Sequence, residues 1–304
     1  MQKASTKINI RKLRKRIFIF LMLAYPVAHF LIFWIFVNFN SVLLAFQRML
    51  IQEQRVVWTL DNFRIIWNML RVNNNFQQMI LNSLSYVPII SFISLPLAII
   101  SSYFMFKKIP GAPVYRVLFF LPSIIPLIVL TIAFQMALDP IFGMVPNALD
   151  TLTGSRTRGP VWFGDWDMAQ FSIYLFMIWS GLGFSIILLS SAMARLPREI
   201  LEYSKLDGAG AMRELFSIYI PLIWPTITTL FVLGLMGFFG IAMQPMFLTG
   251  TLHETLGLRI FLSTRGGANV YFAAALGLAG TLIVAPIILT VRFIMERFHR
   301  DVSF

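Results

Sequence analysis

The strongest constraint on this chain is a series of long apolar segments that carry almost no charge. Each is long enough to cross a membrane, which takes about 20 mostly apolar residues; the segments cover roughly 17–39, 79–105, 117–137, 170–192, 219–246 and 271–292. Of the 304 residues, 58% are hydrophobic and 12% are charged, whereas a soluble domain has about 25% charged residues. The sequence therefore predicts an all-α integral membrane protein, a single domain over 1–304 whose six transmembrane helices lie in the lipid bilayer.

Basic residues are distributed unevenly between the two sides of these spans. The amino-terminal tail, the 106–116 turn, the 193–218 loop and the carboxyl-terminal tail hold seven, three, four and three Lys or Arg residues, or 17 of the 25. The loops on the other side hold eight. Because short loops rich in Lys and Arg remain in the cytoplasm, we expect a multi-pass cell-membrane protein with both termini cytoplasmic. The net charge of +12 follows this pattern and does not indicate a nucleic-acid partner.

The sequence lacks the side chains and motifs of common catalytic and metal sites. It contains no cysteine and three histidines, which excludes thiol chemistry and Cys-ligated metals. The phosphate-binding pattern G-x-x-x-x-G-K-[ST] does not occur, and neither do H-E-x-x-H and G-x-S-x-G. We therefore expect no catalytic residue, no metal site, no cofactor bound by this chain and no ATP hydrolysis by it.

The spans also lack the charged groups on which ion-coupled carriers depend. Such carriers generally hold carboxylates or basic residues within the membrane, whereas the one group expected at depth that titrates near neutral pH is His29. Two interpretations of His29 stay open: it satisfies a carbonyl freed by Pro26 or a group on another helix, or it contacts a substrate. The lack of charge indicates that the energy for any transport enters through a partner.

Residues 202–225 form a polar, charge-balanced island between two long apolar segments. A helix is expected to start at Pro197, since proline suits the first helical turn, and to break at Asp207-Gly208. Asp207 can cap a second short helix, which leads to Pro221 at the start of the fifth span. The island is therefore predicted to be two short helices held at an angle on the cytoplasmic membrane surface.

The loop between the first two spans, about 40–78, has no sustained apolar run. Its sequence from Trp58 to Trp67 suggests a short amphipathic helix capped by Asp61. Aromatic side chains favour the membrane–water interface, so we expect this helix to rest on the outer surface.

The spacing within the island resembles the cytoplasmic EAA loop of ABC importer permeases. The pattern is E-x-x-x-x-D-G-A-x8-I-x2-P-x3-P, and the matching residues are Glu202, Asp207, Gly208, Ala209, Ile218, Pro221 and Pro225. In that family the loop docks on an ATPase subunit, so the resemblance implies that 197–225 is a coupling segment. Tyr203 and Ser204 stand where the family has two alanines, a departure that concerns packing in the ATPase groove.

The resemblance covers about 17–295 and is closest to carbohydrate importer permeases of the maltose and glycerol-phosphate type. Other matching segments are Asn82–Tyr86, Arg116–Pro122, Asp139–Gly143 and Ile178–Phe184. The chain is similar to MalF- and UgpA-like permeases, and specifically to the six-span LplB-type version common for oligosaccharide and polysaccharide uptake. A Gly-rich T-G-G-G-P segment often found after the fifth span is reduced to Thr249–Leu252.

The resemblance implies a type I ABC importer permease fold and a non-catalytic subunit that forms half of a translocation pathway. It also implies several partners: a second permease in a heterodimer, two ATPase subunits that bind ATP, an extracytoplasmic solute-binding protein and a carbohydrate substrate.

A carbohydrate path needs hydrogen-bonding groups and aromatic faces within a cavity. The side chains that meet this description are Trp179, Gln244, Gln135, Asn82 and Ser180. Each also has a structural interpretation, since a tryptophan can simply fill space between helices, and amides often bond one helix to another.

Two other classes of function stay open. A self-contained secondary carrier or channel is disfavoured by the lack of intramembrane charge and by the docking loop. A non-transporting membrane scaffold would be compatible with basic tails and aromatic loops alone. A neighbouring reading frame that encodes a second permease with its own E-x-x-x-x-D-G loop would favour the importer.

Overall fold

A computed structural model of the chain describes residues 2–50, 55–154, 161–197, 199, 210–265 and 269–297. Within these ranges the structure consists of helices and one two-stranded hairpin. Four of the helices are long and apolar enough to cross a membrane, and the number rises to six if two bent helix pairs are each counted as one span. The expected helical membrane protein is thus confirmed at this level.

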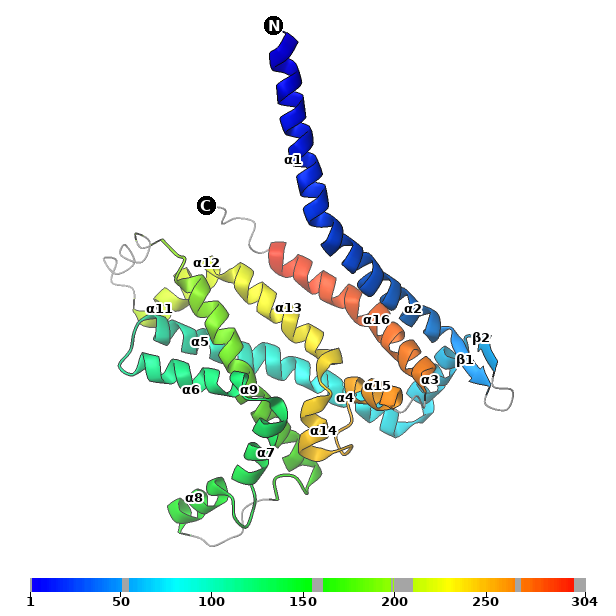
Figure 1. The fold of residues 1–304 in the computed structure, drawn as a ribbon. Coiled ribbons are helices and arrows are strands. Elements are labelled where there is room, and N and C mark those ends of the chain that lie inside the picture. Colours follow the sequence, from blue (N-terminus) through cyan, green and yellow to red (C-terminus); the bar gives the residue numbers. More distant parts are fainter. Residues whose placement is uncertain are drawn as a thin grey trace.

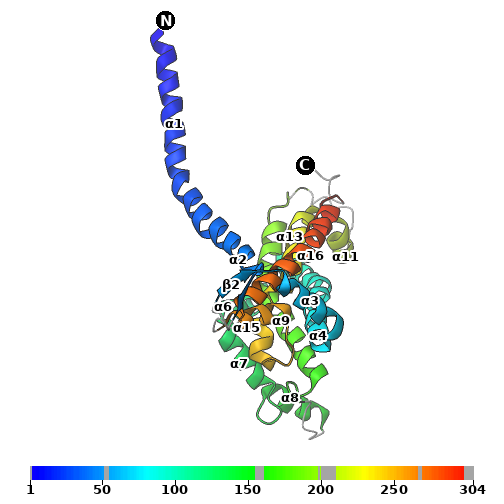
Figure 2. The same ribbon diagram turned by 90° about the vertical axis from the view of Figure 1, so that its right-hand side faces the viewer.

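The first span is a long helix whose amino-terminal part stands away from the others. It consists of α1 (Gln2–His29), a π-helical stretch η1 (Phe30–Phe36) and α2 (Val37–Ala45). Figures 1 and 2 show α1 projecting from the bundle while α2 runs beside α16. None of the apolar window of Lys12–Ala45 is buried within this chain. His29 is exposed on α1, with its ring 4.7 Å from that of Phe33.

A hairpin and a short amphipathic helix follow at one end of the bundle. Strand β1 (Gln47–Leu50) pairs antiparallel with β2 (Arg55–Trp58), and α3 (Asp61–Val72) buries Asn62 and Ile66. Asp61 is the first residue of α3 rather than its cap, and its backbone amide donates to the Thr59 hydroxyl at 3.1 Å. The expected helix is present, but Leu60 holds the cap position that we assigned to Asp61, and it makes no side-chain cap bond.

The second span is one continuous helical rod. It is formed by α4 (Asn74–Pro88), η2 (Ile89–Ser94) and α5 (Leu95–Phe106). The Asn73 side chain caps its start by accepting a hydrogen bond from the Phe76 amide at 3.0 Å, a preference expected of asparagine. The rod ends at a tight turn in which Gly111 adopts φ 82°, a conformation that glycine tolerates best.

The third segment is broken where the sequence predicts one helix over 117–137. Helices α6 (Ala112–Ile124) and α7 (Leu127–Ala137) meet at 112°. The break lies at Ile125 and Pro126, both with ψ near 135°, because proline forces the residue before it out of the helical region.

The Asp139–Gly143 segment forms a compact turn after α7. The Asp139 carboxylate accepts from the backbone amides of Ile141 and Phe142 at 2.9 and 2.8 Å, and both bonds lower the pKa of its exposed carboxyl group. A Cβ at Gly143 would collide with the Asp139 carbonyl. This turn explains why aspartate and glycine occupy these positions, and it leads into α8 (Met144–Thr153).

Helix α9 (Trp166–Met193) lies at the centre of the bundle and packs along α5 and α6. Asp165 caps it by accepting from the Met168 amide at 3.4 Å. Gly183 allows the close approach of α6, since a Cβ at this position would lie 2.5 Å from the Phe119 carbonyl oxygen.

The segment expected as the fifth span, 219–246, is divided into several pieces. The short helices α11 (Ala211–Glu214), η3 (Leu215–Tyr219) and α12 (Ile220–Leu222) lead into α13 (Trp224–Gly240), and the chain then turns through Ile241 into α14 (Met243–Thr249). A hydrogen bond from Thr255 to the Ile241 carbonyl secures that break. The chain continues through α15 (Leu256–Thr264) and α16 (Val270–Arg297).

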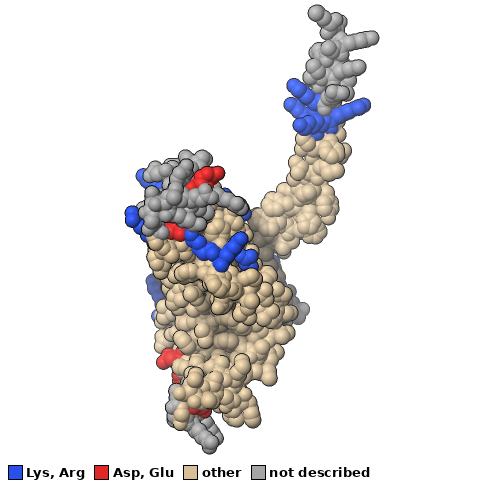
Figure 3. Space-filling view, turned by 90° about the vertical axis from the view of Figure 1, so that its left-hand side faces the viewer, with Lys and Arg blue, Asp and Glu red and all other residues tan. Residues whose placement is uncertain are grey.

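The two ends of the bundle carry different elements. Helices α11 and α12, the turn after α5 and the end of α16 lie at one end, and the hairpin, α3 and α15 lie at the other (Figure 1). On the face in Figure 3, charged side chains gather towards the ends and the broad middle surface is uncharged. Such a belt matches the hydrocarbon layer of a membrane.

Candidate functional site

The residues expected to couple this chain to an ATPase fall partly outside the described structure. Glu202, Asp207, Gly208 and Ala209 lie outside the described residues. Ile218 and Pro221 lie in the segment 211–222, formed by α11, η3 and α12, which we name the coupling arm. The structure therefore shows how the motif continues towards α13, and the roles assigned to its residues stay predictions.

The coupling arm meets α13 at a bend of 77°. The bend lies at Ile223; Pro221 stands in α12 just before it, and Pro225 stands in the first turn of α13 just after it. Proline in a first helical turn leaves no amide donor unsatisfied. Pro225 therefore suits the place where α13 begins, directly after the bend.

The coupling arm has one buried face and one exposed face. Leu215 and Tyr219 of the arm, with Ile223 at the bend, are at most 2% exposed and pack against α5 and α9 in one apolar cluster. On the other face Met212 and Phe216 are 56% and 59% exposed. Residues four apart lie on one side of a helix, so these two side chains form an apolar surface on the arm that no other described part of the chain covers.

A buried carboxylate ties the arm to the end of α5. Glu214 is 4% exposed, and its two oxygens accept hydrogen bonds from the Tyr103 hydroxyl at 2.8 Å and from the Lys107 ammonium at 2.6 Å. The Lys107 ammonium also lies 5.8 Å from the centre of the Tyr219 ring, within range of a cation–π interaction. This group joins residues that are more than 100 positions apart.

Two of the substrate-path candidates lie on the half-exposed side of α9. Trp179 is 37% exposed, and its ring stacks on that of Phe134 with centroids 6.0 Å apart and planes at 22°. Ser180 follows it and is also partly exposed. An aromatic face that is held in place and still accessible suits a sugar ring.

Two other candidates use their amides inside the chain. The Gln135 side-chain nitrogen donates to the carbonyls of Phe247 and Leu248, both at 3.0 Å. Asn82 donates to the Glu254 carbonyl at 3.1 Å. These bonds fix α7 and α4 to the segment 247–254, which favours the structural interpretation of both residues.

Gln244 lies at the start of α14, where the sequence predicts the fifth span to continue. It is half-buried, and its Oε1 is among the buried side-chain atoms of the described residues that have no hydrogen-bond partner within the chain. An unsatisfied buried oxygen costs about 1–3 kcal/mol. Gln244 is therefore the amide of the candidate set that stays available to a hydroxyl-bearing ligand or a partner subunit.

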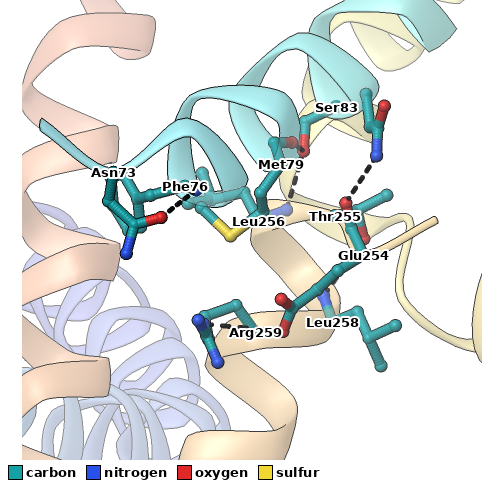
Figure 4. Close-up of polar contacts among 10 residues, drawn as sticks. Asn73, Phe76, Met79, Ser83, Glu254, Thr255, Leu256, Leu258 and Arg259 are labelled. Carbon is teal, nitrogen blue, oxygen red and sulfur yellow. Dashed lines mark hydrogen bonds and ion pairs between the residues drawn. The ribbon is translucent and has the colours of Figure 1, made fainter. Parts of the chain in front are cut away.

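Two bonds hold the chain before α15 against the start of the second span. Figure 4 shows Ser83 of α4 facing the start of α15, where its hydroxyl accepts from the Leu256 amide at 2.7 Å. Thr255 caps α15 by accepting from the Leu258 amide at 3.2 Å. Together with Asn82, these contacts make 254–256 a fixed part of the end opposite the coupling arm.

Neighbouring ionisable groups at this end have shifted pKa values. Burial raises the pKa of Glu254, and Arg259, whose Nε lies 3.5 Å from the Glu254 Oε1, opposes that shift. Burial lowers the pKa of His253, whose Nε2 lies 3.0 Å from the Trp166 carbonyl oxygen. A carbonyl only accepts, so Nε2 carries the proton of the neutral ring.

The sequence argument missed the residues that join distant segments. Tyr103, Lys107, Glu214, His253 and Ser83 were not among the candidates. A signal existed for Glu214 alone, a carboxylate directly before the apolar stretch 215–220. Among the described residues, no group of three or more His, Asp or Glu side chains could hold a metal ion.

Comparison with known proteins identifies a family for most of the chain. Residues 94–304 match the family described as the binding-protein-dependent transport system inner membrane component. The matched region includes α5, the coupling arm and every later helix.

Similar curated proteins are named as permeases of transport systems. The probable ABC transporter permease protein YurN of Bacillus subtilis is 29% identical over 139 residues, 46% of this chain and 47% of that protein. The diacetylchitobiose uptake system permease protein NgcF of Streptomyces coelicolor is 29% identical over 41% of this chain and 36% of its own length. The maltose/maltodextrin transport system permease protein MalF of Salmonella typhimurium is 29% identical over 41% of this chain and 24% of its own length. These matches span less than half the length of each relative.

Two solved structures share the whole fold. One belongs to a bacterial ABC transporter involved in the import of the acidic polysaccharide alginate, with a TM-score of 0.78, 20% identity, and coverage of 94% of this chain and 98% of that chain. The other is a bacterial alginate ABC transporter in complex with an alginate pentasaccharide-bound periplasmic protein, with a TM-score of 0.80, 19% identity, and coverage of 95% and 98%.

Proposed function

The chain belongs to the family of binding-protein-dependent transport system inner membrane components, and from that membership we propose that it is the non-catalytic transmembrane subunit of an ABC importer for a carbohydrate. The expected type I ABC importer permease fold is confirmed by the likeness to the two alginate transporter chains. The proposal goes further than the fold, because it assigns a substrate class, a direction of transport and partners.

The observation that carries this proposal is the family match over 94–304 together with the coupling arm. The arm follows the motif Glu202–Ala209, is packed into the core by Leu215 and Tyr219, and meets α13 at a defined bend. A rigid element of this kind can transmit a displacement from a docked ATPase. The exposed Met212 and Phe216 support a partner on the arm.

The carbohydrate substrate rests on the relatives and on the chemistry of the candidate path. NgcF is named for diacetylchitobiose uptake and MalF for maltose/maltodextrin transport, and the two fold neighbours are named for alginate. In this chain Trp179 offers an accessible aromatic face and Gln244 an unsatisfied oxygen. The proposed substrate is therefore an oligosaccharide or polysaccharide.

The proposed assembly contains a second permease, two ATPase subunits and an extracytoplasmic solute-binding protein. In this arrangement ATP binds to the ATPase subunits, since the chain carries no phosphate-binding motif. Both termini and the coupling arm would lie in the cytoplasm of a cell whose membrane the chain spans, as the distribution of Lys and Arg indicates.

Reconstitution into vesicles tests the proposed function. The chain is co-expressed with a candidate second permease, ATPase and binding protein from the same genome, and uptake of radiolabelled maltodextrin, chitobiose and alginate oligosaccharides is measured with ATP inside the vesicles. We expect uptake of at least one of them that requires both ATP and the binding protein. Uptake by the chain alone in an ion gradient would instead establish a secondary carrier.

A further inference from the structure

The contacts of Glu214 define its position closely. The Tyr103 hydroxyl and the Lys107 ammonium come from successive turns of one helix end and bond to different oxygens of the same carboxylate, at 2.8 and 2.6 Å. Two donors four residues apart in α5 therefore fix both the distance of the coupling arm from α5 and its rotation about that helix.

The surroundings of Lys107 reinforce this arrangement. Its ammonium lies 5.6 and 5.8 Å from the ring centres of Tyr103 and Tyr219, and these two rings meet edge to face with centroids 5.2 Å apart. The Lys107 side chain is 27% exposed, whereas that of Glu214 is 5% exposed. The lysine can thus reach water while the carboxylate cannot.

The buried Lys107–Glu214 ion pair is not explained by protein stability alone. Desolvation of a buried carboxylate costs several kcal/mol, and well-packed apolar residues of similar volume often stabilise a protein equally well. The ion pair instead gives directional contacts that apolar packing lacks.

The helix α5, whose end binds the Glu214 carboxylate, is part of a rod that reaches the opposite end of the bundle. Tyr103 and the cap residue Lys107 belong to α5, which continues without a break through η2 into α4. At the far end of α4, Ser83 accepts from the Leu256 amide at 2.7 Å (Figure 4). Asn82, next to it, donates to the Glu254 carbonyl at 3.1 Å. One helical rod, 74–106, is thus bonded to the coupling arm at one end and to 254–256 at the other.

We propose that Tyr103, Lys107 and Glu214 form a positioning latch through which movement of the coupling arm displaces the rod 74–106 and, with it, the segment 254–256. The latch acts through the rod and touches no substrate. The inference rests on the proposed function, since an ATPase docked beside the arm supplies the movement. It adds to that function a defined mechanical route between the two ends of the chain.

The experiment uses the full complex with its binding protein and a single engineered thiol. The chain contains no cysteine, so Leu252→Cys provides a unique label in this subunit, and Leu252 is 42% exposed. The readout is the rate at which a membrane-impermeant maleimide modifies this thiol, with and without ATP and vanadate. In the otherwise unaltered complex we expect nucleotide to change the rate by about fivefold or more, the lower range of allosteric couplings.

Two variants interrupt the latch. Glu214→Gln keeps the shape of the side chain but loses the charge and one acceptor, and Lys107→Gln removes the ammonium from a partly exposed position. In each we expect the nucleotide-dependent change to fall to less than about twofold, while the ATPase still co-purifies and hydrolyses ATP. The double variant should reduce the nucleotide-dependent change in labelling rate no further than either single variant does, because the two residues act as one unit. If Glu214→Gln fails to assemble, Lys107→Gln carries the test.

Glu296→Gln is the matched control. It removes an exposed carboxylate that pairs with Arg292 at 2.7 Å on α16, and exposed pairs contribute little, so labelling should follow the parent. A nucleotide response of parental size in Glu214→Gln or Lys107→Gln would overturn the latch, and so would loss of the ATPase from an otherwise folded Lys107→Gln complex. An unresponsive parent would also overturn it, whereas failure of the proposed function itself would appear as absent ATP-dependent uptake.

Discussion

Gly183 of α9 lies directly against the backbone of Phe119 in α6, so closely that a Cβ on the glycine would be 2.5 Å from the Phe119 carbonyl oxygen and 3.0 Å from the Phe120 Cα. Backbone atoms cannot move aside as a side-chain tip can. This contact fixes the distance between α6 and α9. Gly181, two residues earlier on the same helix, provides an internal comparison because, apart from its chain neighbours and the adjacent turns of its own helix backbone, no described atom lies within 4 Å of its Cβ position.

Gly183→Ala should destabilise the protein by about 1–3 kcal/mol, because overpacking forces α6 and α9 apart. Gly181→Ala should be neutral or slightly stabilising, since alanine favours the helix over glycine. Thermal unfolding of the purified chain in detergent measures both. Equal unfolding temperatures for the two variants would show that α6 and α9 are not held at this distance.

Glu202→Lys and Gly208→Asp should abolish uptake while leaving the protein in the membrane. Both change the proposed docking motif directly before the coupling arm, and an added Cβ and charge at Gly208 would strain the turn if it needs positive φ. The measurements are ATP-dependent uptake and co-purification of the ATPase, with Glu296→Gln as the control for loss of a surface carboxylate. Transport at the parental rate with the ATPase bound would contradict the coupling role.

Trp179→Ala should weaken uptake about tenfold, as would Gln244→Ala, because a lost stacking face or a lost polar contact costs on the order of 1–3 kcal/mol. Gln135→Ala should behave differently, since its amide bonds the carbonyls of Phe247 and Leu248, and should lower the unfolding temperature instead. Uptake and unfolding are measured for each variant. Parental uptake in assembled Trp179→Ala and Gln244→Ala complexes would place the substrate path elsewhere.

His253 should make stability depend on pH. Burial lowers its pKa in the folded chain below the ordinary value of 6.5, although Asp167 and the Trp166 carbonyl oppose the shift. Below that ordinary value the unfolded chain binds a proton that the folded chain does not, so stability falls as pH drops through 6.5 towards the lowered value and is fully retained above it. Unfolding temperatures at pH 7.5 and 5.5 should differ less in His253→Gln than in the parent; an unchanged difference would exclude this group.

The membrane class and the helical fold could be predicted from the sequence. The thickness of a bilayer sets the length of an apolar helix that crosses it, so each apolar segment can be recognised without reference to any other part of the chain. Local rules also identified the amphipathic helix α3 and the proline at the start of α12. In each case the signal and its structural consequence lie within a few residues.

Local rules were less successful where segments break. Pro126 could have indicated the break between α6 and α7, but the apolar run across it favoured one helix. The break at Ile241 has a weaker local cause, since the bond that secures it comes from Thr255, on the other side of α14. The local sequence around Ile241 does not show that Thr255 will be its hydrogen-bond partner.

What the sequence by itself determined is therefore the set of apolar spans, their predicted sides and the family motif between the fourth and fifth of them. Only the tertiary structure decided which polar side chains meet: Glu214 with Tyr103 and Lys107, Asn82 with the Glu254 carbonyl, Gln135 with α14. The physical reason is that a hydrogen bond requires atoms about 3 Å apart, and that proximity arises from packing of whole helices rather than from spacing along the chain.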